Sequence, residues 1–416
     1  MKPYQEISQC RICGGSDLVP VLSLGNQALT GVFPRSRDEA VTSGPMDLVK
    51  CAESDGGTTC GLVQLRQSYS LTEMYGSHYG YHSDLNASMV RHLHDWVERI
   101  LADVPLKTGD LVLDIGSNDG TLLKAYPLGG PLAVGIDPTG EQFRKHYPPN
   151  VQLIPAFFSS ALVRKHFGAR KAKIVTSISM FYDLEKPLDF AREVREILDD
   201  DGVWALEQSY LPTMIERNAY DTVCQEHLEY YRVRQIQWIM DRADMKIVNL
   251  GLNDVNGGSF WIMASPKGSA RSECSQLLAD FLSKEGPYSA PAPYAAFRDN
   301  VFRHRDELTS LLRRAKGDGI EVLGYGASTK GNVILQFCGL TEMDIPCIGE
   351  VNPDKFGCFT PGTLIPIIPE AEAKSRKPGA FLVLPWHFRD FILKKETDYR
   401  RSGGKLLFPL PSPEVL

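Results

Sequence analysis

The middle of the chain alternates short apolar runs with amphipathic stretches, a pattern that predicts β-strands followed by α-helices. Four apolar runs have the length of buried strands and lie at residues 111–115, 151–158, 173–178 and 203–210. Stretches with the 3.6-residue period of helices lie at residues 88–102, 187–198 and 235–243. Strands at 246–250 and 260–264 are expected to follow. The alternation predicts a doubly wound α/β domain.

The C-terminal third repeats this pattern on a smaller scale. A polar segment at residues 266–293 is interpreted as a connection, and a long amphipathic helix is predicted at 294–316. A strand then leads into the loop Gly324-Tyr-Gly-Ala-Ser-Thr-Lys-Gly331. Thr329 stands where a dinucleotide fingerprint has its third glycine, so nicotinamide binding is not expected. Backbone amides at the start of the next helix, together with Lys330, suit a phosphate instead.

Length and charge narrow the class of protein. The 416 residues suit two or three domains, and we predict divisions at 1–70, 71–290 and 291–416. A net charge of −6 argues against a dedicated nucleic-acid binder. No apolar run approaches the roughly 20 residues of a membrane span, and the first residues lack a signal-peptide core. We expect a cytoplasmic protein, a monomer rather than an oligomer, with no nucleic-acid or membrane partner.

Four cysteines near the start have the spacing of a zinc site. Cys10 and Cys13 form a C-x2-C pair followed by two glycines, and Cys51 and Cys60 form a second, wider pair. In a reducing compartment, clustered cysteines indicate metal more often than disulfides. Four thiolates complete a tetrahedral shell and leave no position for a reacting water, so the predicted Zn²⁺ is structural.

The stretch from Leu111 to Leu123 predicts the cofactor site. An apolar strand runs into a turn with two glycines and two acidic residues, and a helix is expected to follow. Carboxylates repel a pyrophosphate but suit the ribose hydroxyls and positive charge of S-adenosylmethionine. The next predicted strand ends at Asp137-Pro138, where a ribose-binding carboxylate is expected. The alternative interpretation is a glycine turn of an ordinary α/β domain. The turn and this strand end supply the candidates Asp114, Gly116, Asn118, Gly120, Asp137 and Pro138.

Ligands of open α/β sheets lie outside the carboxyl ends of the strands. This rule gathers further candidates around Gly116, namely Ser177, Ser179, Asp183 and Glu207. Phe157 or Phe158 could stack on an adenine, of which we select Phe158, although both are more often core residues. The hairpin turn at Asn256 is a further candidate for contact with the pocket.

Two segments rich in tyrosine and histidine complete the predicted site. His227 follows Glu226 in the loop after the fifth strand, close to Tyr220 and Tyr230, and is a candidate general base. A lone His–Glu pair is usually a solvated surface pair, but its position and the many phenols favour catalysis here. The segment 69–83 is either a cover packed on the next domain or a substrate-facing lip of phenol donors.

Taken together, these motifs resemble those of the S-adenosylmethionine-dependent sugar C-methyltransferases, which act on nucleotide-linked 4-keto-6-deoxyhexoses. The resemblance covers essentially the whole length: the C-x2-C-G-G zinc region, the central domain and the Gly-Tyr-Gly-Ala-Ser-Thr-Lys-Gly loop. It implies a class I, Rossmann-like methyltransferase domain between the zinc region and a second Rossmann-like domain that binds the nucleotide sugar. Family members carry tyrosine and histidine where Cys224 and Gln225 stand, and histidine at the position of Asp183.

The resemblance implies a mechanism with methyl transfer to carbon, C3 of the sugar favoured over C5, and S-adenosylhomocysteine as product. His227 and Glu226 carry the base function, and Tyr79 and Tyr81 supply active-site hydroxyls. Substrate contacts are expected from Tyr220, Tyr230, Glu207, Asp183, Asn256, Lys330 and His387. Three alternatives stay open: a small-molecule O- or N-methyltransferase, a zinc-ribbon RNA-modifying or RNA-binding protein, and a binding protein without catalysis.

Overall fold

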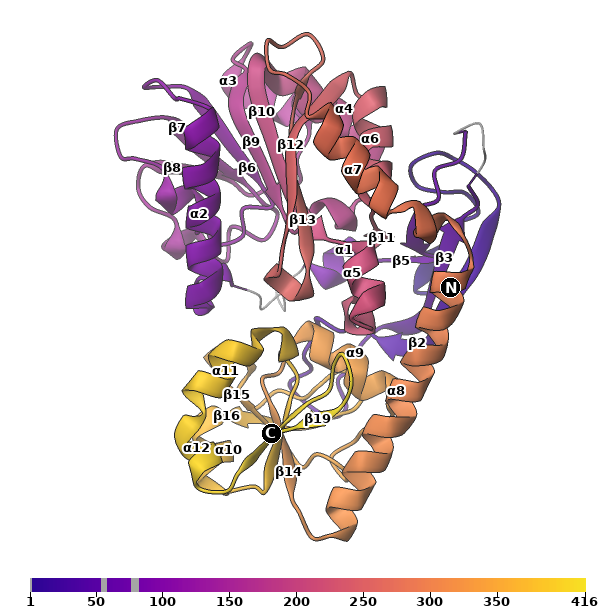
Figure 1. Cartoon of the computed structure of the whole chain (residues 1–416). Helices are drawn as coiled ribbons and strands as arrows, with labels where there is room; N and C mark the ends of the chain where they lie inside the picture. The colour runs from indigo at the N-terminus through magenta and orange to yellow at the C-terminus, as the bar shows by residue number, and fades with distance from the viewer. Residues whose placement is uncertain (1, 54–57, 76–81) are drawn as a thin grey trace.

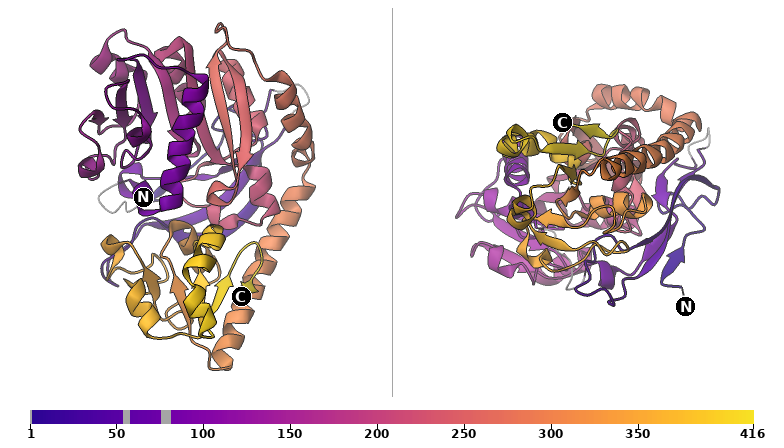
Figure 2. Two further views of the ribbon diagram at one scale, coloured as in Figure 1. Left: turned by 60° about the vertical axis from the view of Figure 1, so that its left-hand side comes forward. Right: turned by 90° about the horizontal axis from the view of Figure 1, so that it is seen from below.

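The computed structural model describes residues 2–53, 58–75 and 82–416, arranged around three main sheets (Figure 1). The central and C-terminal sheets lie in separate lobes, and the N-terminal strands pass between them. The long helix α8 (Ala292–Gly317) runs along one side of the molecule and leads from one lobe into the other (Figure 2). Within the described part of the chain, no helix is long and apolar enough to cross a membrane.

The central sheet has seven strands in the order β12-β13-β10-β9-β6-β7-β8. Their bounds are β6 (Leu111–Ile115), β7 (Leu132–Ile136), β8 (Val151–Ile154), β9 (Ala172–Ile178), β10 (Leu198–Ser209), β12 (Met245–Asn253) and β13 (Ser259–Pro266). The first five in chain order pair in parallel, whereas β13 is antiparallel to both β10 and β12. The predicted doubly wound α/β class is therefore confirmed.

Alternate residues of these strands face different layers of helices, as the period of two demands. Val112 of β6 belongs to the same apolar cluster as Trp96 of α2 (Ala87–Asp103), on one face of the sheet. Leu113, next to it, belongs to the cluster on the other face. That face is covered by α4 (Pro187–Ile197) and α6 (Val233–Arg242), and α7 (Ser275–Lys284) packs beside α6. The helices α3 (Ser160–Phe167) and α5 (Leu211–Glu216) flank the sheet.

One expected element is absent from this part of the fold. The turn after β6 leads into a single 3-10 turn, Leu122–Ala125, and not into the predicted α-helix. Short 3-10 turns also lie at Ser83–Leu85, Arg144–His146, Phe181–Asp183, Tyr220–Thr222, Val255–Gly257, Gly286–Ser289, Pro353–Lys355 and Trp386–Phe388. The sheet face that this helix was expected to cover is covered instead by α2. The helix on this face therefore comes from the segment before β6 and not from the segment after it.

The N-terminal sheet takes one of its strands from far along the chain. Its order is β11-β4-β3-β2, with β2 (Leu18–Ala28), β3 (Ser43–Cys51), β4 (Val63–Leu65) and β11 (Glu229–Tyr230). A separate pair joins β1 (Tyr4–Glu6) to β5 (Gln67–Tyr69), and the short helix α1 (Leu71–Met74) follows. Because β11 directly follows the segment that carries His227, the N-terminal sheet and the central domain are built together.

The C-terminal sheet is parallel except for its last strand. Its order is β16-β15-β14-β17-β18-β19, with β14 (Val322–Tyr325), β15 (Ile348–Glu350), β16 (Ile367–Pro369), β17 (Ala380–Val383), β18 (Lys405–Phe408) and β19 (Glu414–Val415). The accompanying helices are α9 (Thr329–Phe337), α10 (Glu370–Ser375), α11 (Arg389–Lys395) and α12 (Thr397–Arg401). One continuous apolar cluster joins this sheet to the N-terminal strands and to residues 211–230.

Candidate active site and zinc centre

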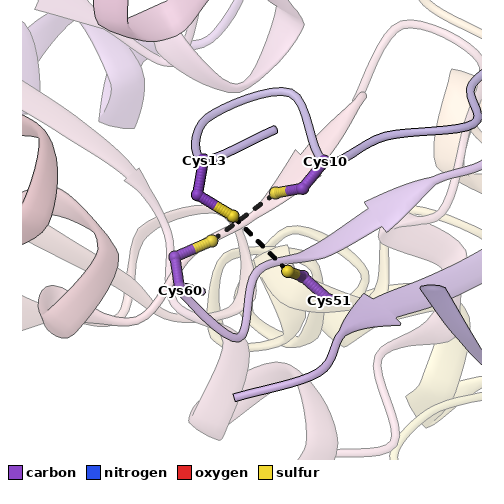
Figure 3. Close-up of side chains that lie close together, drawn as sticks. All are labelled: Cys10, Cys13, Cys51 and Cys60. Atoms are coloured by element: carbon purple, nitrogen blue, oxygen red, sulfur yellow. Dashed lines mark hydrogen bonds between the residues drawn. The ribbon is translucent and has the colours of Figure 1, made fainter. Parts of the chain in front are cut away.

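The four predicted zinc ligands converge on one point (Figure 3). The sulfur atoms of Cys10 and Cys60 lie 3.5 Å apart, as do those of Cys13 and Cys51, and all four lie within 4.8 Å of one another. A regular tetrahedron with Zn–S bonds near 2.3 Å has sulfur–sulfur edges of about 3.8 Å. The arrangement therefore fits a Zn²⁺ ion held by four thiolates, with no position left for a catalytic water.

The predicted cofactor turn lines a pocket at the carboxyl end of β6. Asp114, Gly116, Ser117 and Asn118 form one side of the pocket, together with Ser83 from the segment that precedes α2. Gly116 has φ +77°, and a Cβ atom there would lie 2.9 Å from Met180 Cγ. Any other residue at this position would be strained and would press into the side chain that covers the turn. The backbone is thus shaped to bring a ligand close to the strand end.

Two buried carboxylates shape this pocket. Asp137 accepts hydrogen bonds from the Asn118 amide (2.8 Å) and from the amide and hydroxyl of Thr139 (2.7 and 2.6 Å). Asp114 accepts from the Thr176 hydroxyl (2.6 Å), and burial raises the pKa of its carboxyl to about 7. Asp137 therefore fixes the glycine turn, and its remaining lone pairs suit the hydroxyls of a ribose.

The structure brings some of the other cofactor candidates to this pocket and separates one of them from it. Asn118 lines it, and Gly120 and Pro138 belong to the same two loops. Ser177, however, is fully buried and accepts a hydrogen bond from the Trp204 indole, and Phe158 packs on Phe190 at a ring distance of 5.0 Å. The Ser177 side chain serves the core, which is at odds with a cofactor role, whereas Phe158 is only partly buried and its cofactor role stays a prediction.

His227 is held in a defined tautomer. Its Nδ1 atom lies 2.8 Å from the Thr222 carbonyl oxygen, which can only accept, so Nδ1 carries the proton and Nε2 carries the lone pair. The Tyr182 ring packs on the imidazole at 4.3 Å. Burial, and then the nearby Lys330 ammonium, lower the pKa of His227 to about 3. The imidazole is therefore neutral at physiological pH, with its Nε2 available to take a proton.

Glu226 lies where the three parts of the chain meet. The Thr30 hydroxyl donates to its carboxylate at 3.5 Å, and a Cβ at Gly31 would lie 2.4 Å from its Oε1. The same Cβ would lie 3.9 Å from the Thr329 hydroxyl of α9. Burial raises the pKa of Glu226. Gly31, which nothing in the sequence marks as functional, provides the space that this carboxylate occupies.

Lys330 connects the C-terminal lobe to the central sheet. Its ammonium donates to the Asn256 carbonyl at 2.8 Å, and the Asn256 amide donates to the Ser179 hydroxyl at 3.4 Å. Ser179 in turn follows β9 at the edge where the ligand pocket lies. Hydrogen bonds thus connect three predicted site residues, Ser179, Asn256 and Lys330, although Ser179 and Lys330 are 151 residues apart in the sequence.

The loop after β17 closes the other side of the His227 segment. The Trp386 indole donates to the buried Asp221 carboxylate at 2.7 Å, and the Lys330 charge acts on the same carboxylate. His387 Nδ1 is buried without a hydrogen-bond partner among the described residues, and burial with Lys330 lowers the pKa of its imidazole well below the usual range. Asp221 was not expected from the sequence, because its partner lies 165 residues further along.

Comparisons with known proteins agree with this arrangement. Three family descriptions match in succession: "Putative zinc binding domain" at residues 10–75, "Methyltransferase domain" at 83–250 and "C-methyltransferase C-terminal domain" at 254–411. The C-methyltransferase NovU of Streptomyces niveus is 30% identical over 99% of this chain and 97% of its own length. The chain belongs to this family of C-methyltransferases.

The C-methyltransferase uses S-adenosylmethionine and carries a zinc-binding cluster of four cysteines. Among solved structures, it is similar to an S-adenosylmethionine-dependent methyltransferase from Clostridium acetobutylicum (12% identity, TM-score 0.34), over 42% of this chain and 92% of the other. The magnesium protoporphyrin IX methyltransferase of Synechocystis shares 16% identity at a TM-score of 0.33, over 44% and 82% of the two chains. The predicted boundaries at residues 70 and 290 remain predictions.

Two predicted substrate contacts of the C-methyltransferase lie elsewhere than expected. Glu207 is fully buried and accepts from His92 (2.7 Å), the Trp96 indole (2.8 Å) and Asn253 (2.6 Å). Its carboxylate ties α2 to the sheet. Tyr220 is also fully buried, with its hydroxyl 3.1 Å from His304 of α8. Both side chains are occupied inside the protein, which is at odds with substrate binding.

The remaining candidates lie beside His227. Asp183 accepts a hydrogen bond from the Tyr75 hydroxyl at 2.9 Å, and its other carboxyl oxygen is buried with no partner in the described part of the chain. Burial raises the pKa of Asp183 well above the usual range, and the Glu226 carboxylate raises it further. The Tyr230 hydroxyl is likewise buried and unpartnered within residues 2–53, 58–75 and 82–416. Tyr79 and Tyr81 lie outside the described residues.

Proposed function

We propose that this C-methyltransferase methylates a carbon next to the ketone of a nucleotide-linked 4-keto-deoxysugar, with C3 favoured over C5. The observation that carries the proposal is the tautomer of His227, fixed by the Thr222 carbonyl so that Nε2 keeps its lone pair. Carbon next to a ketone becomes a nucleophile only after a base removes its proton. A neutral imidazole in the loop that closes the site supplies such a base.

The proton balance follows from this geometry. Nε2 of His227 takes the proton from the carbon, the C–H electron pair becomes the enolate, and the imidazolium later releases its proton to solvent. A positioned base contributes about 10²–10⁴ in rate. S-adenosylmethionine, when bound, supplies the electrophilic methyl group and leaves as S-adenosylhomocysteine. Asp114, Gly116, Asn118 and Asp137 are the residues that would hold it.

A base with a pKa of about 3 is weak, so the enolate itself must be stabilised. The Lys330 ammonium that lowers the pKa of His227 favours a negative oxygen for the same electrostatic reason. Asp183 supports this role, because a carboxyl kept neutral by burial can donate a hydrogen bond to an oxyanion. One such donor is worth about 3 kcal/mol. Tyr79, Tyr81 and Tyr230 are further donors that the family resemblance suggests, and Glu226 is placed to accept a sugar hydroxyl.

The C-terminal lobe is proposed to hold the nucleotide. Helix α9 begins next to Lys330, and the amide of Gly331 is already occupied by the Ser328 hydroxyl at 3.0 Å. The helix N-terminus and the ammonium together attract the negative charge of a diphosphate. The buried Nδ1 of His387, which no described residue contacts by a hydrogen bond, adds a polar group beside them. Nucleotide and sugar would then extend from the Lys330 lobe towards His227.

Deuterium exchange tests the proposal directly. The protein, saturated with S-adenosylhomocysteine in D₂O, is incubated with a panel of 4-keto-deoxysugar nucleotides, and mass spectrometry follows loss of the C–H proton. We expect exchange at one carbon next to the ketone, and none with His227→Asn. Methyl transfer to oxygen or nitrogen without exchange at carbon would contradict the proposal.

A further inference from the structure

Arg11 lies between the zinc ligands Cys10 and Cys13, but its side chain points into the protein and is only 2% exposed. The guanidinium donates to the Leu65 carbonyl at 2.5 Å and to the Ser68 hydroxyl at 2.8 Å. Both acceptors lie at or just beyond the end of β4. The Arg11 side chain, which does not bind the metal, therefore attaches the zinc knuckle to the N-terminal sheet.

The same guanidinium faces a buried carboxylate from the active-site loop. Arg11 Nε lies 3.9 Å from Oε1 of Glu229, whose side chain is fully buried. Neither carboxyl oxygen of Glu229 has a hydrogen-bond partner, so Arg11 is the cation that compensates it within the described structure. Glu185 also accepts from Arg11, at 3.2 Å, but its side chain is 44% exposed and remains solvated. Burial raises the pKa of Glu229 well above its usual range, and the Arg11 guanidinium acts in the opposite direction, so Arg11 favours the charged form of this buried carboxyl.

Glu229 forms β11 two residues after His227. It pairs with Gln64 of β4, Tyr230 pairs with Val63, and the Leu65 amide donates to the Leu228 carbonyl at 2.8 Å. On the other side, the Leu228 amide donates to the Tyr182 carbonyl at 2.8 Å. The residue next to His227 is thus hydrogen-bonded on one side to the strand that Arg11 fastens and on the other to the central domain.

We propose that Arg11 is a positioning residue, through which the zinc knuckle fixes the β4–β11 ladder and so the place of His227. The zinc then has a role beyond stapling the N-terminal strands, because its knuckle carries the guanidinium that binds the end of β4, and β4 pairs with the active-site strand. The kinetic part of this inference rests on the proposed function of His227, whereas the structural part does not.

The test replaces Arg11 with methionine and measures hydrogen–deuterium exchange, the rate of methyl transfer, the affinity for S-adenosylhomocysteine and the zinc content. Hydrogen–deuterium exchange should increase in peptides covering residues 224–232 and stay unchanged in those covering 111–120. The rate of methyl transfer should fall about 10- to 100-fold, while the affinity for S-adenosylhomocysteine and the zinc content stay unchanged. Arg37→Met is the matched control, since Arg37 pairs with Glu342 at the surface with both side chains more than 40% exposed.

The double variant Arg11→Met with Glu229→Gln separates positioning from general damage. Because Arg11 acts on β11 through Leu65, the double variant should exchange in residues 224–232 like Arg11→Met. Unchanged exchange in Arg11→Met, full recovery in the double variant or loss of zinc would overturn the inference. If Arg11→Met does not fold, Arg11→Gln removes the charge and the guanidinium but keeps a polar side chain, and wild-type exchange in that variant would then overturn the inference. Altered exchange in a protein that methylates no keto sugar refutes the proposed function alone.

Discussion

The molecule contains two strand–glycine turns of one design that serve different purposes. Gly116 follows β6 with φ +77°, and Gly326 follows β14 with φ +79°. In each case an acidic residue at the end of the next strand accepts a backbone amide of the turn: Asp137 from Asn118 at 2.8 Å, and Glu350 from Ala327 at 2.7 Å. The first turn borders the pocket predicted to hold the cofactor, whereas a Cβ at Gly326 would lie 2.8 Å from the Pro385 ring of its own lobe.

The difference lies in what surrounds each turn. The two carboxylates do not differ, because Glu350 accepts two further amides, of Val351 and Asn352, as Asp137 accepts the amide and hydroxyl of Thr139. The Lys355 ammonium donates to the Ala327 carbonyl at 2.8 Å and closes the turn from the other side. Beyond this filled turn, Lys330 in the first turn of α9 reaches the Asn256 carbonyl of the central lobe. The first turn thus lines a pocket of its own lobe, whereas the second is followed by a lysine that contacts the other lobe.

The largest effect is expected where the two lobes meet, at His227. His227→Asn should lower methyl transfer by at least about 10²-fold, because a positioned base contributes 10²–10⁴. Binding of S-adenosylhomocysteine should be unchanged in calorimetry, because its predicted contacts lie on the first turn and not in the His227 segment. His166→Asn, a change at an exposed histidine of α3, is the control. Near-wild-type turnover in His227→Asn would remove this residue from the mechanism.

Lys330→Met tests the role of the Lys330 ammonium, which follows the second turn. Loss of a charged hydrogen bond of about 1.5–3 kcal/mol should raise KM for the sugar nucleotide with little change in KM for the methyl donor. The pKa of His227 should also rise, because the Lys330 ammonium now lowers it. As the pH is lowered, kcat/KM of the variant should therefore begin to fall at a higher pH than kcat/KM of the wild type. Lys316→Met, on the exposed end of α8, is the control; an unshifted acid limb would contradict the proposed proximity.

The two glycines offer a matched pair of substitutions. Gly116→Ala should lower the free energy of unfolding by about 1–3 kcal/mol, the usual strain of a side chain at positive φ, and should weaken binding of S-adenosylhomocysteine because this turn lines the predicted cofactor pocket. Gly326→Ala carries the same strain and meets Pro385, but it should leave this affinity unchanged while raising KM for the sugar nucleotide. Calorimetry with S-adenosylhomocysteine separates the two. An equal loss of affinity for S-adenosylhomocysteine in both variants would mean that the two turns do not bind different ligands.

The smallest effect is expected at Asp183, on the wall beside Glu226. Because burial keeps this carboxyl neutral, Asp183→Asn preserves both charge and a hydrogen-bond donor and should change the activation free energy by about 1 kcal/mol or less. Wild-type activity should fall at high pH as the carboxyl ionises, and the amide variant should lack that fall. An infrared band of a protonated carboxyl at neutral pH, absent from the variant, checks the protonation state without any substrate.

Local chemistry was predictable from the sequence, and long-range packing was not. The convergence of the four cysteines and the sharp turn at Gly116 could be predicted, because metal-ligand spacing and glycine turns leave signals within a few residues. Ser177 and Glu207 were assigned to ligands because they end strands, yet Trp204 and the α2 side chains occupy them. Such partners lie 27 to 115 residues away and follow no period. The missing helix after Gly120 has the same cause, because α2 covers that face from the preceding segment.

Strand β11 also constrains the order in which the protein can assemble on the ribosome. Its partner β4 is synthesised about 165 residues earlier, which at about 5–20 residues per second is a delay of roughly 10–30 s. During that interval the edge of β4 is unpaired, and the zinc thiols are already outside or in the exit tunnel. A Zn²⁺ ion that binds early would hold the unpaired edge of β4 in its folded position until β11 is synthesised. A nascent chain stalled before residue 229 should therefore depend on Zn²⁺ for its folding more than the completed enzyme does. A low Zn²⁺ concentration during synthesis should lower the yield of folded enzyme.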